Sequence, residues 1–142
     1  MKKIAIINGP NLNRLGKRDP EIYGPESWED TAEALRREFP DLVITDAQTN
    51  SEGTFIDLLQ AQADEEDVIG IIINPGAYAH YSLAIADAIS DLAIPTVEVH
   101  ISNIMAREDF RSRSVTGARC RAIISGAGRR GYALAIRLLA ES

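Results

Sequence analysis

Short runs rich in β-branched residues alternate with segments of helical periodicity along this chain. We expect strands at residues 2–8, 42–48, 68–74, 96–102 and 121–126. Helical patterns follow the first three runs, at residues 27–39, 54–64 and 82–93, and a fourth at residues 132–142 follows the last run and closes the chain. Strict alternation of this kind favours parallel strands joined by right-handed crossovers. The sequence therefore predicts an α/β fold of flavodoxin-like size, with a doubly wound, five-stranded parallel sheet and three layers.

The segment 27–39 has the clearest helix signals. Ser27 stands three residues before Asp30, the spacing of a capping box, and Pro40 stops the helix. The segment 82–93 is apolar over most of its helical circumference. Because such a helix is usually covered on both sides, we expect a subunit contact there.

Length and composition limit the class of protein. With 142 residues, 45% hydrophobic and 25% charged, the chain is expected to form one domain, residues 1–142. A net charge of -6 argues against nucleic acid as a partner. The first apolar run ends at Asn8, too short for a secretory signal, and no stretch is long enough to span a membrane. The single cysteine, Cys120, excludes an intrachain disulfide, so a cytoplasmic location is expected.

Polar residues gather where three of the predicted strands end, which is where open α/β sheets bind ligands. They are Asn8, Asn11, Asn13, Asn74, His80, Glu98, His100, Ser102 and Asn103. Glu98 and His100 lie two apart on a strand and so share a face. A carboxylate there can fix the imidazole tautomer, which makes His100 a candidate proton donor. Two other interpretations stay open: a structural histidine, and a Glu98 that only pairs with an arginine.

Residues 14–24 form a long polar excursion, which we call the lid loop because loops of this length in compact domains are often lids. The lid loop carries Arg14, Lys17, Arg18 and Tyr23. Guanidinium charges near a phenol favour its ionised form, which would make Tyr23 a candidate base. The alternative is a solvated loop whose tyrosine packs on the surface.

Positive charge concentrates late in an otherwise acidic chain. Residues 101–131 hold seven arginines and only two acidic residues, which predicts a pocket for a small anion. The arginines are Arg107, Arg111, Arg113, Arg119, Arg121, Arg129 and Arg130.

Several chemistries do not fit the residues. GAGRRG at 126–131 has the glycine spacing of a dinucleotide site, but it follows the last predicted strand instead of the first and lacks the acidic residue expected about 20 positions later. The three lysines, Lys2, Lys3 and Lys17, are poorly placed for a Schiff base. No ligand spacing specifies a metal centre. The sequence favours cofactor-free proton transfer on an anionic substrate.

Five motifs together resemble the type II 3-dehydroquinate dehydratase family. They are NGPNLN (8–13), LGKRDPEIYG (15–24), INPGAYAH (73–80), VEVHISN (97–103) and AREDFR (106–111). The resemblance implies a lyase of the shikimate pathway, the route to chorismate and the aromatic amino acids. It also implies trans elimination of water from 3-dehydroquinate through an enolate to give 3-dehydroshikimate, without a cofactor. The family's flavodoxin-like subunits assemble as a dodecamer, a tetramer of trimers.

The resemblance also implies roles for residues at matching positions. Tyr23 is similar to the general base and Arg18 to the lid arginine beside it. Asn11 resembles the residue that holds the water polarising the enolate oxygen. His100 resembles the general acid, with Glu98 behind it.

Substrate contacts are implied in the same way. The backbone of Ile101 and Ser102 resembles the cradle of the substrate carboxylate. Other matching positions are Asn74, His80, Arg111, a second arginine near the tyrosine (Arg107) and a residue that reaches a neighbouring subunit (Asp87). The chain departs from the family pattern at Ser51 and at residues 112–115. The alternatives are a flavodoxin-like nucleotide- or phosphate-binding module without catalysis, and an oligomeric scaffold.

Overall fold

The computed structural model describes residues 1–141. Its sheet is fully parallel with the order β2-β1-β3-β4-β5, as the alternating pattern predicts. The strands are β1 (Lys3–Asn8), β2 (Val43–Gln48), β3 (Val68–Asn74), β4 (Thr96–His100) and β5 (Ala122–Ser125). The helices are α1 (Pro20–Tyr23), α2 (Trp28–Glu38), α3 (Glu52–Ala63), α4 (Leu83–Ser90) and α5 (Arg130–Ala140).

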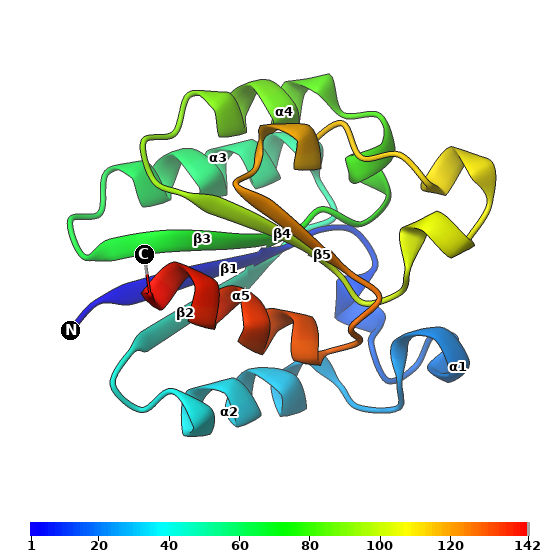
Figure 1. Cartoon of the computed structure of the whole chain (residues 1–142), viewed down its shortest axis with the longest axis horizontal. Helices are drawn as coiled ribbons and strands as arrows, with labels where there is room; N and C mark the ends of the chain where they lie inside the picture. Colours follow the sequence, from blue (N-terminus) through cyan, green and yellow to red (C-terminus); the bar gives the residue numbers. More distant parts are fainter. Residues whose placement is uncertain (142) are drawn as a thin grey trace.

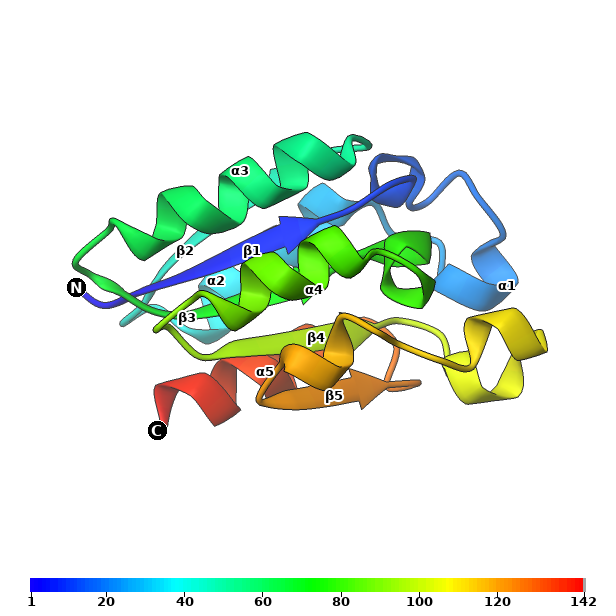
Figure 2. The same cartoon turned by 90° about the horizontal axis from the view of Figure 1, so that it is seen from above.

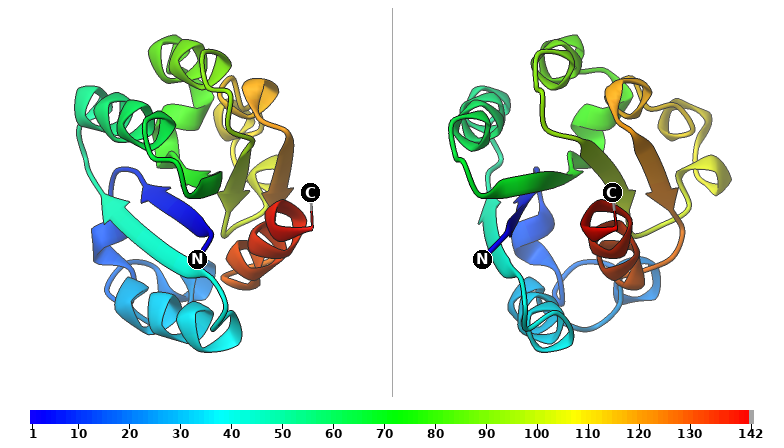
Figure 3. Two further views of the ribbon diagram at one scale, coloured as in Figure 1. Left: turned by 90° about the vertical axis from the view of Figure 1, so that its left-hand side faces the viewer. Right: turned by 60° about the vertical axis from the view of Figure 1, so that its left-hand side comes forward.

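Helices cover both faces of the sheet and complete three layers. Helices α3 and α4 lie on one face, and α2 and α5 lie on the other (Figure 1, Figure 3). Successive residues of β3 serve the two layers, since Ile72 packs in the α2/α5 core whereas Ile71 and Ile73 pack in the α3/α4 core. Gly70 allows α5 to lie close, because a Cβ atom there would stand 2.8 Å from the Leu139 side chain. The predicted fold class is confirmed.

Helix α2 begins with the capping box predicted from its sequence. The Ser27 hydroxyl accepts a hydrogen bond from the Asp30 amide, and the Asp30 carboxylate accepts one from the Ser27 amide, each at 3.2 Å. Helix α3 begins two residues before the predicted start, because the Ser51 hydroxyl caps it by accepting from the Thr54 amide at 3.3 Å. Helix α4 ends at Ser90, three residues early.

Two further segments differ from the sequence prediction. Strand β4 ends at His100, not at residue 102, so Ile101 and Ser102 form a bend beyond the sheet. The lid loop is not irregular throughout, because it contains the four-residue helix α1, which Pro20 begins with its fixed backbone angle. A short 3-10 helix, Leu12–Arg14, precedes it.

The carboxyl ends of the strands meet the lid loop and the segment 101–116 at one end of the molecule (Figure 1, Figure 2). This is the end at which polar residues gather in the sequence. Among residues 1–141, no helix combines the length and the apolar character needed to cross a membrane.

Candidate active site

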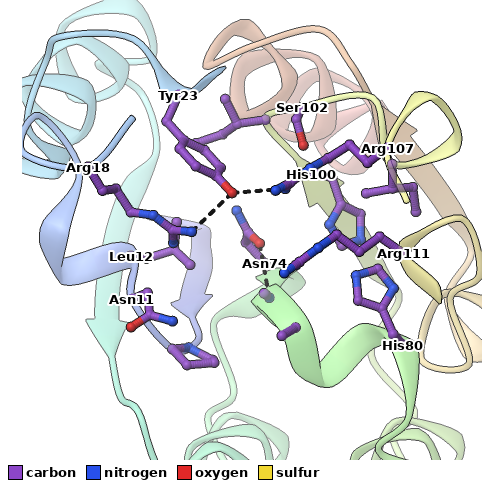
Figure 4. Close-up of a pocket in the computed structure, with 15 residues that line it drawn as sticks. Asn11, Leu12, Arg18, Tyr23, Asn74, His80, His100, Ser102, Arg107 and Arg111 are labelled. Atoms are coloured by element: carbon purple, nitrogen blue, oxygen red, sulfur yellow. Dashed lines mark hydrogen bonds between the residues drawn. The ribbon is translucent and has the colours of Figure 1, made fainter. Parts of the chain in front are cut away.

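A pocket opens at this end of the sheet, beyond β1, β3 and β4 (Figure 4). It is lined by polar and charged side chains more than by apolar ones, as suits a hydroxylated anion. The lining polar residues are Asn11, Arg18, Tyr23, Asn74, His80, His100, Ser102, Arg107 and Arg111, with Ile101 beside them.

Tyr23 is the last residue of α1, and its side chain lines the pocket. Its phenolic oxygen accepts hydrogen bonds from Arg18 Nη2 at 3.1 Å and from Arg107 Nη1 at 2.9 Å. The Arg18 guanidinium also lies over the ring, 4.3 Å from its centre. Both donors are charged, and hydrogen bonds from charged donors are stronger than those between neutral groups. The solvated-surface alternative for this tyrosine is wrong.

His100 is the last residue of β4 and is buried. Its Nε2 lies 2.7 Å from Glu98 Oε2. The fully buried Glu98 also accepts hydrogen bonds from the hydroxyls of Ser114, at 2.5 Å, and Thr116. Three donors converge on this carboxylate, and the contact with Glu98 assigns an imidazole proton to Nε2. Nδ1 is then the ring nitrogen that can exchange a proton. Glu98 pairs with the histidine and not with an arginine.

His80 lies beside His100, with the two rings nearly parallel and their centres 6.4 Å apart. The contact of His80 Nδ1 with the carbonyl oxygen of Arg113, at 2.7 Å, assigns the proton to Nδ1. Because that nitrogen donates to the backbone, Nε2 of His80 is the acceptor left to the pocket.

Two asparagines form the floor and edge of the pocket. Asn74 donates through Nδ2 to Tyr132 Oη at 3.0 Å, and its Oδ1 accepts from the Gly76 amide at 3.2 Å. Tyr132 in turn donates to Asn8 Oδ1 at 2.9 Å. Burial raises the pKa of the Tyr132 phenol well above its ordinary value, so Tyr132 keeps its proton and acts as both donor and acceptor.

Asn11 is at the pocket edge with a left-handed backbone, φ 71°, a conformation that asparagine tolerates better than most residues. The backbone N–H of Asn11 donates a hydrogen bond to Asn50 Oδ1 at 3.0 Å.

The structure does not bring every predicted residue into the pocket. Asp87 lies on the exposed face of α4, and Glu98 stands behind His100 instead of lining the cavity. Of the seven arginines between residues 101 and 131, only Arg107 and Arg111 line the pocket. The arginine-rich segment is therefore not one anion site.

Sequence reasoning missed the residues that hold the others in place. Ser114, Thr116, Tyr132 and Arg129 bind predicted site residues but follow them in the chain by 16 to 106 positions. No local spacing indicates such contacts. Residues 112–115, where the sequence differs from the family pattern, include Ser114, but that difference does not indicate that Ser114 donates to Glu98.

The fold and the pocket define a doubly wound α/β protein in which a phenol and an imidazole line one polar pocket. The chain belongs to the class II dehydroquinase family, whose sequence profile matches residues 2–140.

Relatives match along nearly their full length. A 3-dehydroquinate dehydratase of Clostridium beijerinckii is 53% identical over 139 residues, which are 96% of this chain and 94% of the relative. One of Deinococcus radiodurans is 50% identical over 141 residues, 97% of each chain. The crystal structure of a type II dehydroquinase from Butyrivibrio crossotus superposes with a TM-score of 0.94 at 44% identity, covering 98% of this chain and 97% of that one.

Proposed function

We propose that this pocket dehydrates 3-dehydroquinate to 3-dehydroshikimate, with Tyr23 as the base and His100 as the acid. The observation that carries the proposal is the convergence of two guanidinium groups on Tyr23 Oη, at 2.9 and 3.1 Å, beside a buried His100–Glu98 pair. Membership of the class II dehydroquinase family makes the chain a 3-dehydroquinate dehydratase of the shikimate pathway.

The first step is removal of a proton alpha to the ketone. Tyr23, whose phenolic oxygen contacts Arg18 and Arg107, takes this proton, and the electrons of the broken C–H bond move to the ketone oxygen to form an enolate. Negative charge moves off the phenolate as it forms on the substrate, so donors must face the new oxyanion. Asn11, at the pocket edge, is placed to bind the water that donates to the enolate.

The second step is loss of the hydroxyl group beta to the ketone. Collapse of the enolate breaks the C–O bond, and protonated His100 delivers a proton so that water departs, not hydroxide. Glu98 supports the imidazolium through Nε2, which leaves Nδ1 to donate. Before the next cycle, Tyr23 gives its proton to the solvent and His100 regains one from it.

The remaining lining residues bind the substrate. The bend at Ile101 and Ser102 is fixed because the carbonyl oxygens of His100 and Ile101 accept from the Gly126 and Gly128 amides, at 3.2 and 3.1 Å. This bend is a suitable cradle for the substrate carboxylate. Asn74, Arg107 and Arg111 offer donors to its hydroxyl and ketone oxygens, and His80 Nε2 offers an acceptor to a hydroxyl group.

A homo-oligomer explains the position of Asp87. Leu83 and Asp87 are four residues apart on one face of α4, and Leu83 is 68% exposed in the single chain. If a neighbouring subunit covers this face, Asp87 of this chain would lie near the pocket of that neighbour. We expect a dodecamer of four trimers in the cytoplasm. Size-exclusion chromatography with light scattering measures the mass of the assembly.

A spectrophotometric assay tests the function. We expect 3-dehydroquinate to give the absorbance of the conjugated enone product without added metal or cofactor. A Tyr81→Phe variant, altered at an exposed tyrosine outside the pocket, should keep its turnover. Absence of product together with a borohydride-trapped adduct would instead indicate the imine route that the lysines argue against.

A further inference from the structure

Arg129 joins the body of the protein to the end of the lid loop. Its side chain is only 14% exposed and makes polar contacts with five residues between 23 and 31. Its Nε donates to the Tyr23 carbonyl oxygen at 3.1 Å and lies 3.4 Å from Glu26 Oε2. Its Nη1 donates to the Ser27 carbonyl oxygen at 2.9 Å and to Thr31 Oγ1 at 2.8 Å. Its Nη2 donates to the Gly24 carbonyl oxygen at 3.4 Å. We infer that Arg129 is a positioning residue, which holds the peptide of the proposed base. The inference rests on the proposed function.

The position of Arg129 is energetically unfavourable for a cation unless acceptor atoms of the lid loop compensate. Arg129 directly precedes helix α5, where the helix dipole disfavours a cation. Its guanidinium is also largely removed from water, which costs free energy unless oxygen atoms replace the lost hydration. The carbonyl oxygens at the end of the lid loop supply that replacement. A lysine has no planar fork and cannot bridge the same set of acceptors.

The backbone on both sides permits the contact. The turn between β5 and α5 uses positive φ angles at Gly126 (88°) and Gly128 (62°), which directs Arg129 towards the lid loop. On the other side, Gly24 has φ 83°, and a Cβ atom there would lie 3.4 Å from Arg129 Nε. The GAGRRG motif, which does not fit a dinucleotide site, therefore presents the guanidinium group that fastens the lid loop.

Tyr23 is thus held from the body at two points. Arg107 binds its phenolic oxygen and Arg129 binds its carbonyl oxygen. Arg18, the other ligand of the phenolic oxygen, lies within the lid loop and moves with it. Without Arg129, the attachments of Tyr23 to the body are the hydrogen bond from Arg107 and the packing of its ring against the core. Because a displacement of about 1 Å at a reacting group can cost about 100-fold in rate, this second attachment matters for catalysis.

The test compares Arg129→Met with Arg130→Met, which removes the same charge from the adjacent exposed residue. We expect kcat/KM to fall about 10- to 100-fold in Arg129→Met, mostly through kcat, and to stay near the wild-type value in Arg130→Met. Arg129→Lys should recover part of the loss, because an ammonium group reaches one or two of the acceptors. Wild-type kcat/KM in Arg129→Met would overturn the inference.

A double-mutant cycle separates positioning from a general loss of structure. If Arg129 acts through Tyr23, Arg129→Met should change the residual turnover of a Tyr23→Phe enzyme by less than about 2-fold. An equal loss in both backgrounds would show that Arg129 supports the fold and not the base. If Arg129→Met does not fold, Thr31→Val removes one acceptor of the same guanidinium and should reduce kcat slightly, again only when Tyr23 is present.

Limited proteolysis tests the attachment without substrate. Trypsin should cut after Arg14, Lys17 or Arg18 several-fold faster in Arg129→Met than in wild type or Arg130→Met, at unchanged melting temperature. Equal cutting rates would overturn the inference. A wild-type chain that failed to dehydrate 3-dehydroquinate would contradict the proposed function, but it would leave this measurement of the lid loop intact.

Discussion

The two reacting groups of the pocket are held in opposite ways. Tyr23, the proposed base, comes from a four-residue helix in a loop, and charged groups approach it from the same loop and from the segment that contains Arg107. His100, the proposed acid, ends a strand with neighbours on both sides, and its partner Glu98 is fully buried. The proposed base therefore lies on a loop outside the sheet, whereas the proposed acid is part of the core.

The difference follows from the chemistry each side must support. A buried carboxylate is tolerated only if donors satisfy it, and Glu98 has three: His100, Ser114 and Thr116. Such a cluster needs fixed neighbours, which strands β3 and β5 provide. The phenol needs only positive charge and access. Mutations on the base side should therefore affect turnover alone, and mutations on the acid side should affect turnover and stability together.

The largest effect is expected from Tyr23→Phe. Loss of the phenolic oxygen removes the base, so kcat should fall by roughly 100- to 10,000-fold. The melting temperature should stay within a few degrees, since the ring and its packing remain. Steady-state kinetics and calorimetry on one preparation test both statements. Turnover close to that of wild type would remove Tyr23 from the mechanism.

Glu98→Gln should show the contrasting behaviour of the acid side. The amide group has one acceptor oxygen instead of two, and its NH2 group meets either the Thr116 hydroxyl, on the Oε1 side, or the Ser114 hydroxyl and the His100 N–H, on the Oε2 side. We expect kcat to fall about 100-fold and the free energy of unfolding to fall by about 1–3 kcal/mol. Urea titration measures the second quantity. A variant with full stability and low activity would erase the proposed contrast.

Thr116→Val removes one donor from Glu98 at nearly constant shape. The free energy of unfolding should fall by about 1–2 kcal/mol, with a smaller loss of kcat than in Glu98→Gln. Thr96→Val is the matched control, because the buried Thr96 hydroxyl has only a 3.5 Å contact with the Ile94 carbonyl oxygen. Equal losses of stability in the two variants would mean that the hydrogen bond from the Thr116 hydroxyl to Glu98 contributes no more than the weak contact of Thr96.

The smallest effect concerns Cys120, whose Sγ lies 3.5 Å from the Thr116 carbonyl oxygen. Burial, followed by the nearby Glu98 carboxylate, raises the pKa of the Cys120 thiol well above its usual range. The folded protein therefore holds this thiol protonated, and raising the pH above the ordinary thiol pKa favours unfolding, where the thiol can ionise.

Reaction with a disulfide reagent at pH 8 measures this property. Native protein should react at least about 10-fold more slowly than protein in denaturant, because one pKa unit changes the thiolate fraction about tenfold. Similar rates would show that the segment around Thr116 opens readily, contrary to a rigid acid side.

The same contrast separates what the sequence predicts from what it does not. The fold was predictable because apolar runs such as 68–74 and caps such as Ser27 are local signals. The pocket residues could be collected because parallel strands end at one edge, and this rule alone places Asn74 and His100 close together.

The supporting contacts were not predictable for a physical reason. Thr116 and Arg129 act through hydrogen bonds to residues far away in the sequence, and a polar residue in a loop has many possible partners. Pro20 did not suffice to predict helix α1, because a single helical turn is formed by its contacts and not by its own propensity.

The link from Tyr132 to Asn8 and Asn74 also bears on how the protein is made. During synthesis on the ribosome, both asparagines emerge long before the tyrosine that orients them. A nascent chain that stops short of residue 132 can assemble strands but leaves these amides without their shared partner. The pocket therefore acquires its final shape late in translation, so incomplete chains should not turn over substrate.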